Sequence, residues 1–199
     1  MNIGLYFGSF NPVHCGHLII ANHILNESSL TKIWFIVSPQ NPFKQGGSLL
    51  NEYDRLHLLK LATEDDPRIK ISDIEFTLPR PSFTSTTLSH LQEKHPDAQF
   101  SIIMGSDSFQ NLHKWHNYEY IVKNYPIFVY RRMGFEVENH TRSQLNLVDA
   151  PLLQISATQV RQLIKAGKSI RYFHTSPTCE TNSPCATAIH FEGTVTRAV

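Results

Sequence analysis

The chain has 199 residues, of which 41% are hydrophobic, and its 18 basic and 17 acidic residues give a formal net charge of +1. This length is ample for one α/β domain with a buried core, and no internal repeat or Gly/Ser-rich linker indicates a second domain. The balanced charge argues against a nucleic acid or an anionic membrane as partner.

The first predicted element is a buried strand over residues 3–7. The chain enters this strand without the basic region and apolar core of a signal sequence, and no apolar run approaches the roughly 18 residues of a membrane span, so we expect a cytoplasmic protein. Gly8, Ser9 and Asn11-Pro12 break the strand, and apolar residues at helical spacing predict a helix from Gly16 onward. Strand, glycine turn and helix place backbone N–H groups at one point that suits an anion such as phosphate.

Two histidines stand three residues apart at the start of this helix. His14 and His17 share one face if the turn is helical, and Gly16 between them lets a ligand approach the backbone. A metal pair and simple helix capping are the other interpretations. A closed zinc site needs more ligands than this pair supplies.

The apolar run at residues 33–37 is typical of a parallel strand that is covered on both faces. With the first strand and helix it has the size of a right-handed βαβ unit, whose ligands lie outside the carboxyl ends of the strands. We therefore predict an α/β fold of the Rossmann-like, doubly wound class, with a mainly parallel sheet and helices on both faces. The loop over residues 38–48 has the composition of a mobile lid, and its Lys44 is either a solvated lysine or a cation that closes over a polyphosphate.

Asn51 is expected to cap a helix whose exposed first turn includes Arg55, and residues 69–73 alternate as a strand. A segment rich in hydroxyl residues then precedes another helix. There Ser82 or Thr84 either caps the helix or leaves its N–H groups to bind a substrate carboxylate.

Two further buried strands are predicted at residues 100–104 and 127–130, and an edge strand at 145–148. Asp107, just after the first of these, can accept hydrogen bonds from a ribose or a base amine, or cap a helix. Arg131-Arg132 follows the second and suggests a bidentate clamp on a phosphate, with Arg132 favoured by its position.

The segment Ile155-Ser-Ala-Thr-Gln-Val-Arg161 begins the last predicted helix. Ser156 and Gln159 form a capping box, and Gly167 ends the helix. Arg161 adds a second cationic focus beside a helix N-terminus, which suits the β- and γ-phosphates of a triphosphate.

Residues 8–17, Gly-Ser-Phe-Asn-Pro-Val-His-Cys-Gly-His, resemble the phosphate-binding signature of the nucleotidyltransferase superfamily that carries His-x-x-His, and residues 155–161 resemble its second signature. Over about residues 2–173 the chain resembles the bacterial nicotinate-nucleotide adenylyltransferases. The resemblance implies a single nucleotidyltransferase domain over residues 1–173. It also implies transfer of AMP from ATP to nicotinate mononucleotide, giving deamido-NAD (nicotinate adenine dinucleotide) and pyrophosphate, a step of NAD biosynthesis.

The resemblance also implies roles for particular residues. The implied catalytic residues are His14, His17, Lys44 and Arg161. The implied ATP-binding residues are Gly8, Ser9, Phe10, His14, His17, Gly105, Asp107, Ile155, Ser156 and Arg161. The implied mononucleotide-binding residues are Asn11, Gln40, Asn41, Phe83, Thr84, Trp115 and Arg132. Trp115 would stack on the pyridine ring, although on general grounds it is more often a core residue.

The implied reaction needs no general base, because a phosphate monoester with a second pKa of about 6 is already ionised at neutral pH. We expect Mg²⁺ to arrive with ATP and to keep much of its water, so that no protein residue is a metal ligand. Alternatives are another adenylyltransferase of the superfamily, with nicotinamide mononucleotide or phosphopantetheine as acceptor, or a catalytically silent nucleotide-binding regulator. The sequence leaves the oligomeric state open, including a homo-oligomer.

Two features depart from the family. Asn11 stands where many relatives have Asp, which puts in doubt any role there that needs a full negative charge. Residues 174–199 form an atypical tail, rich in Thr and Ser, where the family usually ends with an amphipathic helix, and disorder is one expectation for it.

The three cysteines, Cys15, Cys179 and Cys185, do not make a disulfide framework.

Overall fold

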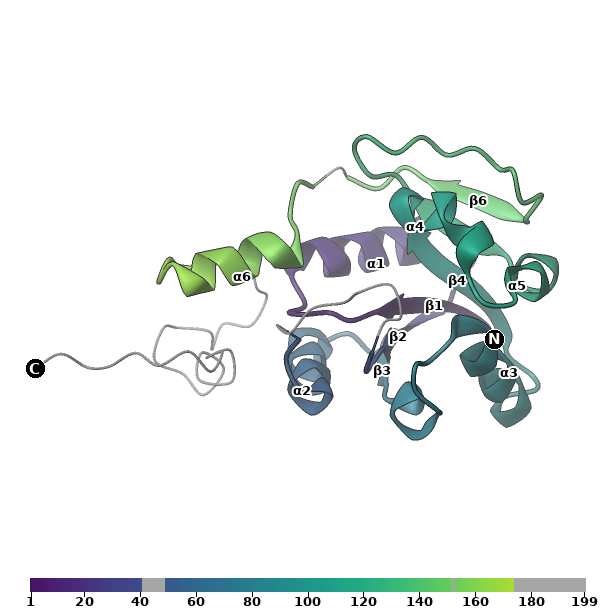
Figure 1. Cartoon of the computed structure of the whole chain (residues 1–199), viewed down its shortest axis with the longest axis horizontal. Helices are drawn as coiled ribbons and strands as arrows, with labels where there is room; N and C mark the ends of the chain where they lie inside the picture. The colour runs from purple at the N-terminus through teal and green to yellow at the C-terminus, as the bar shows by residue number, and fades with distance from the viewer. Residues whose placement is uncertain (41–48, 152, 174–199) are drawn as a thin grey trace, which may run out of the picture.

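The protein folds around one parallel sheet, as seen in a computed structural model that describes residues 1–40, 49–151 and 153–173 (Figure 1). The strands are β1 (Asn2–Gly8), β2 (Lys32–Val37), β3 (Ile69–Ser72), β4 (Gln99–Gly105), β5 (Ile127–Tyr130) and β6 (Leu145–Val148). Their order is β3-β2-β1-β4-β5-β6, and every adjacent pair is parallel. The winding reverses between β1 and β4, which is where open α/β sheets bind ligands.

Helices cover both faces of this sheet. They are α1 (Cys15–Glu27), α2 (Glu52–Thr63), α3 (Thr84–Lys94), α4 (Ser106–Gln110), α5 (Tyr118–Asn124) and α6 (Ala157–Lys165), with 3-10 helices η1 (Ile74–Thr77) and η2 (Leu112–Lys114). One hydrophobic cluster packs α1 and α2 on one face, and a second packs α3, α5 and the α4–η2 segment on the other. The doubly wound, Rossmann-like α/β prediction is therefore confirmed.

Alternation along β1 explains the two layers. Ile3 and Leu5 point into the cluster under α3, whereas Tyr6 belongs to the cluster under α1, since successive side chains of a strand face opposite sides. Among the helices of the described residues, none has both the length and the apolar character needed to cross a bilayer.

Three predicted helix ends are confirmed. Asn51 accepts a hydrogen bond from the Tyr53 N–H (2.9 Å) and caps α2, and Ser156 accepts from the Gln159 N–H (3.2 Å) and caps α6. Gly167, at a φ of +66°, follows the end of α6 in the left-handed conformation that favours glycine.

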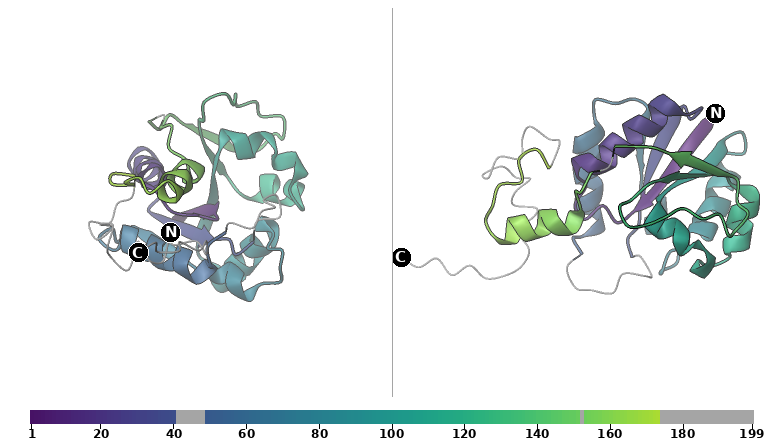
Figure 2. Two further views of the ribbon diagram at one scale, coloured as in Figure 1. Left: turned by 60° about the vertical axis from the view of Figure 1, so that its left-hand side comes forward. Right: turned by 90° about the horizontal axis from the view of Figure 1, so that it is seen from above.

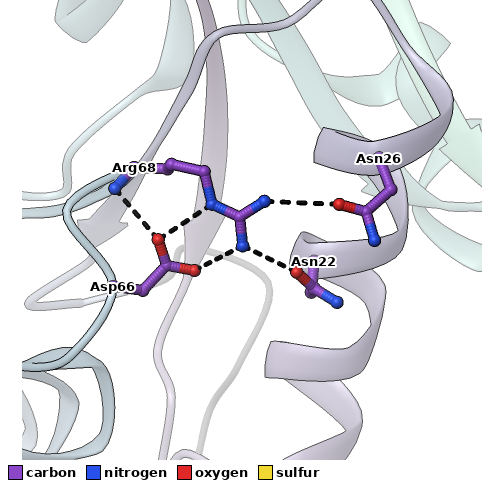
Figure 3. A network of polar contacts seen from close by, with 4 residues as sticks. All are labelled: Asn22, Asn26, Asp66 and Arg68. Atoms are coloured by element: carbon purple, nitrogen blue, oxygen red, sulfur yellow. Dashed lines mark hydrogen bonds and ion pairs between the residues drawn. The ribbon is translucent and has the colours of Figure 1, made fainter.

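A polar network fastens the outer part of α1 to the turn before β3 (Figure 3). The Arg68 guanidinium donates to both carboxylate oxygens of Asp66 (2.9 and 2.7 Å), and also to the side-chain oxygens of Asn22 (2.8 Å) and Asn26 (3.3 Å). The two asparagines lie one turn apart on α1, so one planar fork can reach both. Both asparagines lie in the second half of α1, at the far end of the helix from the two histidines.

Candidate active site

The turn after β1 folds tightly onto the end of the strand. Phe10 has a φ of +43° and is buried, and its ring lies so close to Gly8 that a Cβ there would be 2.7 Å from the Phe10 Cζ. Only glycine fits this contact. The Gly8 carbonyl accepts from the Ser38 N–H (2.9 Å), so the loops after β1 and β2 meet at one edge of the sheet, as predicted.

The two histidines lie face to face at the start of α1. Their ring centroids are 3.8 Å apart with an interplanar angle of 29°. The His14 backbone N–H donates to the Nδ1 of His17 (3.2 Å). A neutral imidazole has one donor and one acceptor nitrogen, so this bond places the His17 proton on Nε2 and makes that nitrogen a hydrogen-bond donor.

His14 is held neutral by its surroundings. The side chain is buried, and this burial, with a smaller effect of the Arg132 cation, lowers its pKa to about 4. Its Nδ1 is buried without a hydrogen-bond partner among the described residues. A Cβ at Gly16 would lie 3.0 Å from that nitrogen, so the close approach depends on glycine. Buried polar atoms without partners are uncommon and are typical of sites that bind a ligand.

The start of α6 lies against the turn that follows β1. Arg161 donates to the Asn11 carbonyl oxygen (2.6 Å) and to the Thr158 hydroxyl (3.1 Å). Ile155 approaches the start of α1, because its Cβ lies 3.8 Å from the place of a Cβ on Gly16. Figures 1 and 2 show the two helices nearly end to end, with the start of α6 next to the start of α1. The Cys15 N–H at the start of α1 donates to the Phe173 carbonyl (2.9 Å), so the chain itself occupies this donor.

A third group of polar residues lies at the ends of β4 and β5. Arg132 pairs with an Asp107 carboxylate oxygen (3.3 Å) and donates to the Tyr130 hydroxyl (3.2 Å). A Cβ on Gly105 would lie 2.5 Å from the other Asp107 oxygen and 2.9 Å from the Arg132 Nε, so both side chains pass over this glycine. Arg131 pairs instead with the exposed Asp149 (2.9 Å). The two arginines therefore do not act as one clamp, and Arg132 alone faces the site.

A cavity of about 120 Å³ opens beside Gly8. It is lined by Phe7, Gly8, Ser38, Glu75, Ser82, Phe83, Thr84, Ile102, Ile103, Met104, Ser108 and Trp115. Trp115 lines this cavity and also packs against the core under α3, which confirms its place in the core, and its stacking on a pyridine ring stays a prediction. Phe83 stacks on His116, with centroids 4.6 Å apart. The cavity thus has aromatic walls beside the start of a helix, which suits a flat ring.

The start of α3 rests on a buried carboxyl group that the sequence did not reveal. Glu75 accepts from the hydroxyls of Ser82 (2.7 Å) and Thr87 (3.0 Å), and burial raises its pKa. The prediction that Ser82 or Thr84 caps this helix is wrong, because Phe83 is the N-cap residue and Thr84 is the first helical residue. The N–H groups of this first turn therefore have no side-chain cap from their own N-cap residue.

The remaining predicted residues divide between described and undescribed segments. Gln40 is exposed, and Lys44 and Asn41 lie outside the described residues. The Asn11 side-chain oxygen accepts from the Leu50 N–H (3.2 Å), a task for which a neutral amide suffices. Within residues 1–40, 49–151 and 153–173, no group of three or more His, Cys, Asp and Glu side chains is arranged to hold a metal ion.

The expectation that Arg55 is exposed is also wrong: this side chain is fully buried. It lies on the inward face of α2 beside Leu56 and Leu59, and that helical spacing was the one signal that could have revealed it. Glu75 offered no comparable signal, because its partners follow it by 7 and 12 positions and lie across a turn.

Comparison with known proteins gives a consistent result. A family model described as cytidylyltransferase-like matches residues 5–163. Proteins named probable nicotinate-nucleotide adenylyltransferase are 50% identical in Flavobacterium psychrophilum and 51% identical in Flavobacterium johnsoniae, each over 174 residues, 86% of this chain and 90% of the relative. A solved Plasmodium falciparum nicotinic acid mononucleotide adenylyltransferase, complexed with NaAD, has a similar fold. Its TM-score is 0.72 and its identity 21%, over 85% of this chain and 86% of that one.

Proposed function

This chain belongs to the family of nicotinate-nucleotide adenylyltransferases, and we propose that it transfers AMP from ATP to nicotinate mononucleotide, giving nicotinate adenine dinucleotide and pyrophosphate. One observation supports this function most directly. The start of α1, with its stacked histidines, and the start of α6, whose second turn carries Arg161, meet beside a cavity that has aromatic walls. A nucleoside triphosphate and a flat aromatic acceptor are the two ligands that these features suit.

The reaction is an in-line displacement at phosphorus. A phosphate oxygen of nicotinate mononucleotide attacks the α-phosphorus of ATP, and the bond from that phosphorus to the bridging oxygen of pyrophosphate breaks. The nucleophile is already ionised at neutral pH, so no protein base is required. Catalysis then consists of holding two anions in line and stabilising the charge that develops on the phosphate oxygens.

The histidines and Arg161 divide this electrostatic work. His17 donates from Nε2 to an α-phosphate oxygen, a role supported by the backbone bond to its Nδ1. His14 stays neutral at pH 7 because its pKa is about 4, and it too recognises the α-phosphate by hydrogen bonding. Arg161 and the N–H groups of α6 hold the β- and γ-phosphates that leave as pyrophosphate. Asp107 would accept hydrogen bonds from the ATP ribose.

The acceptor occupies the cavity beside Gly8. Its pyridine ring stacks on Trp115, and its carboxylate accepts hydrogen bonds from the first N–H groups of α3, near Thr84. Arg132 binds its phosphate. The loop after β2 supplies the remaining proposed residues: Gln40 and Asn41 bind the mononucleotide, and Lys44 is catalytic, as the sequence predicts. Magnesium carried by ATP would offset part of the negative charge of the triphosphate.

Pyrophosphate release from ATP, measured side by side with three acceptors, tests the proposal. We expect the highest kcat/KM with nicotinate mononucleotide and lower values with nicotinamide mononucleotide, because the uncharged amide lacks the charge-assisted contact at α3. Phosphopantetheine should give no release above background. Preference for either of the other acceptors would reassign the substrate, and no release with any of them would favour a silent nucleotide-binding regulator.

A further inference from the structure

Arg55 on α2 is a buried cation that the proposed mechanism does not use. Its side chain is fully buried. Its described hydrogen-bond partners are backbone carbonyl oxygens, namely those of Ser9 (2.7 Å), Ser38 (2.8 Å), Leu50 (2.9 Å) and Pro39 (3.2 Å). Burying a charge is costly, so an arginine placed this way is expected to serve a specific purpose.

The four carbonyl groups belong to three separate segments. Ser9 lies in the turn after β1, Ser38 and Pro39 lie in the loop after β2, and Leu50 directly precedes α2. A guanidinium is a rigid plane with donors in fixed directions, so four bonds from one plane fix these segments relative to one another. A lysine has one small head group and cannot reproduce this geometry.

The same bonds lead directly into the candidate active site. Leu50, which receives a bond from Arg55, donates its own N–H to the Asn11 side chain (3.2 Å). The Asn11 carbonyl in turn accepts from Arg161 (2.6 Å). Arg55 on α2 therefore binds the segment between Gly8 and the histidines through the Ser9 carbonyl, and Arg161 on α6 binds the same segment through the Asn11 carbonyl.

We propose that Arg55 is a positioning residue for adenylyl transfer: it sets the turn after β1 in the position from which that turn receives the phosphates of ATP. It touches no substrate itself. This inference rests on the proposed function. It extends that function to a residue that the nucleotide-binding signatures do not include.

Arg68 offers a matched control. It is also an arginine whose guanidinium makes four side-chain hydrogen bonds, but these join α1 to the turn before β3, away from the ATP site (Figure 3). The experiment compares Arg55→Lys and Arg68→Lys with the wild-type chain. Circular dichroism and a thermal melt first establish a temperature at which all three are folded, and kcat and KM for ATP and nicotinate mononucleotide are measured there.

Both variants are expected to have a lower Tm than the wild type. Only Arg55→Lys should lose activity, by about 10- to 100-fold in kcat/KM for ATP, because a small displacement of a positioned group is enough for such a loss. Arg68→Lys should stay within about twofold of the wild type, the scatter expected of a variant that leaves substrate positions alone. Its activity, with that of the wild type, tests the proposed function separately from the role of Arg55.

Arg55→Gln is the second variant, since it buries no charge and keeps one donor group. A folded Arg55→Lys or Arg55→Gln protein with kcat/KM equal to that of Arg68→Lys would overturn the proposal. Failure of both Arg55 variants to fold at any temperature would overturn it as well, because Arg55 would then be a residue that folding requires.

Discussion

The Arg161 guanidinium donates a hydrogen bond to the carbonyl oxygen of Asn11, 2.6 Å away, although 150 positions of the chain separate the two residues. The contact joins the turn after β1 to α6, the last described helix. An ATP molecule whose α-phosphate lies at one helix start and whose γ-phosphate lies at the other requires such an approach. Had Arg161 been far from His14 and His17, the function inferred from the two signatures would have failed.

His17→Ala tests the role of the histidine pair. We expect kcat to fall by about 100-fold or more, because a donor aimed at charge that develops in the transition state contributes mainly there. The KM for ATP should change little. The measurement is steady-state pyrophosphate release, with His57→Ala, an exposed position on α2, as the control. An unchanged kcat would remove this role from His17.

The pKa of His14 predicts how stability depends on pH. His14 has a pKa of about 4 in the folded protein against 6.5 for an ordinary histidine. Between these values the unfolded chain binds a proton that the folded protein does not. Stability from this group is therefore complete above pH 6.5 and falls as the pH is lowered toward 4, by about 3 kcal/mol in total.

The check is urea unfolding of the wild type and of His14→Asn at several pH values between 4 and 7. Asparagine does not titrate, so the wild type should lose more unfolding free energy than the variant as the pH falls. Curves that run parallel over this range would contradict the assignment of a neutral, buried His14.

Gly105→Ala should disturb the Arg132–Asp107 pair. The new Cβ would lie 2.5 Å from an Asp107 oxygen and 2.9 Å from the Arg132 Nε, so both side chains must move. We expect KM for nicotinate mononucleotide to rise by about tenfold, the loss of about 1.4 kcal/mol of binding. Gly134→Ala is the control, because no atom lies within 4 Å of its added Cβ and only the positive φ is strained. Equal KM values in the two variants would argue against Arg132 as a ligand.

Glu75→Leu tests the buried support of α3. The substitution leaves the Ser82 hydroxyl without its described acceptor, whereas the Thr87 hydroxyl keeps the Phe83 carbonyl (3.2 Å), and we expect a loss of about 2–3 kcal/mol in unfolding free energy. Adding Ser82→Ala removes the stranded hydroxyl and should recover part of that loss. Urea unfolding of the single and double variants measures both effects. A double variant less stable than Glu75→Leu would show that the carboxyl does not support α3 through the Ser82 hydroxyl.

Most of the fold could be predicted from the sequence because its strands and helix ends depend on residues that are close together in the chain. The buried strands are continuous apolar runs, and the starts of α2 and α6 carry capping residues next to their own N–H groups. The candidate site was predictable where its parts are contiguous, as in residues 8–17 and 155–161. The proposed roles of these residues, the single domain over residues 1–173, the cytoplasmic location and the homo-oligomer stay predictions.

The interactions that join distant segments could not be predicted. The sequence predicts an exposed Arg55, because arginine side chains are usually exposed. Its burial is explained by hydrogen bonds to backbone carbonyl groups of three separate segments. Adjacent arginines in the sequence suggested a joint clamp, yet Arg131 and Arg132 pair with Asp149 and Asp107 in different places. Residues next to one another after a strand tend to point to opposite sides.

The reverse reaction tests the convergence of the two helix starts most directly. With nicotinate adenine dinucleotide and pyrophosphate as substrates, Arg161→Met should raise the KM for pyrophosphate by about tenfold or more, since it removes a charge-assisted contact, and leave the KM for the dinucleotide within about twofold. Lys165→Met, in the last turn of the same helix, should change neither value. An unchanged KM for pyrophosphate in Arg161→Met would contradict the account that α6 holds the leaving group.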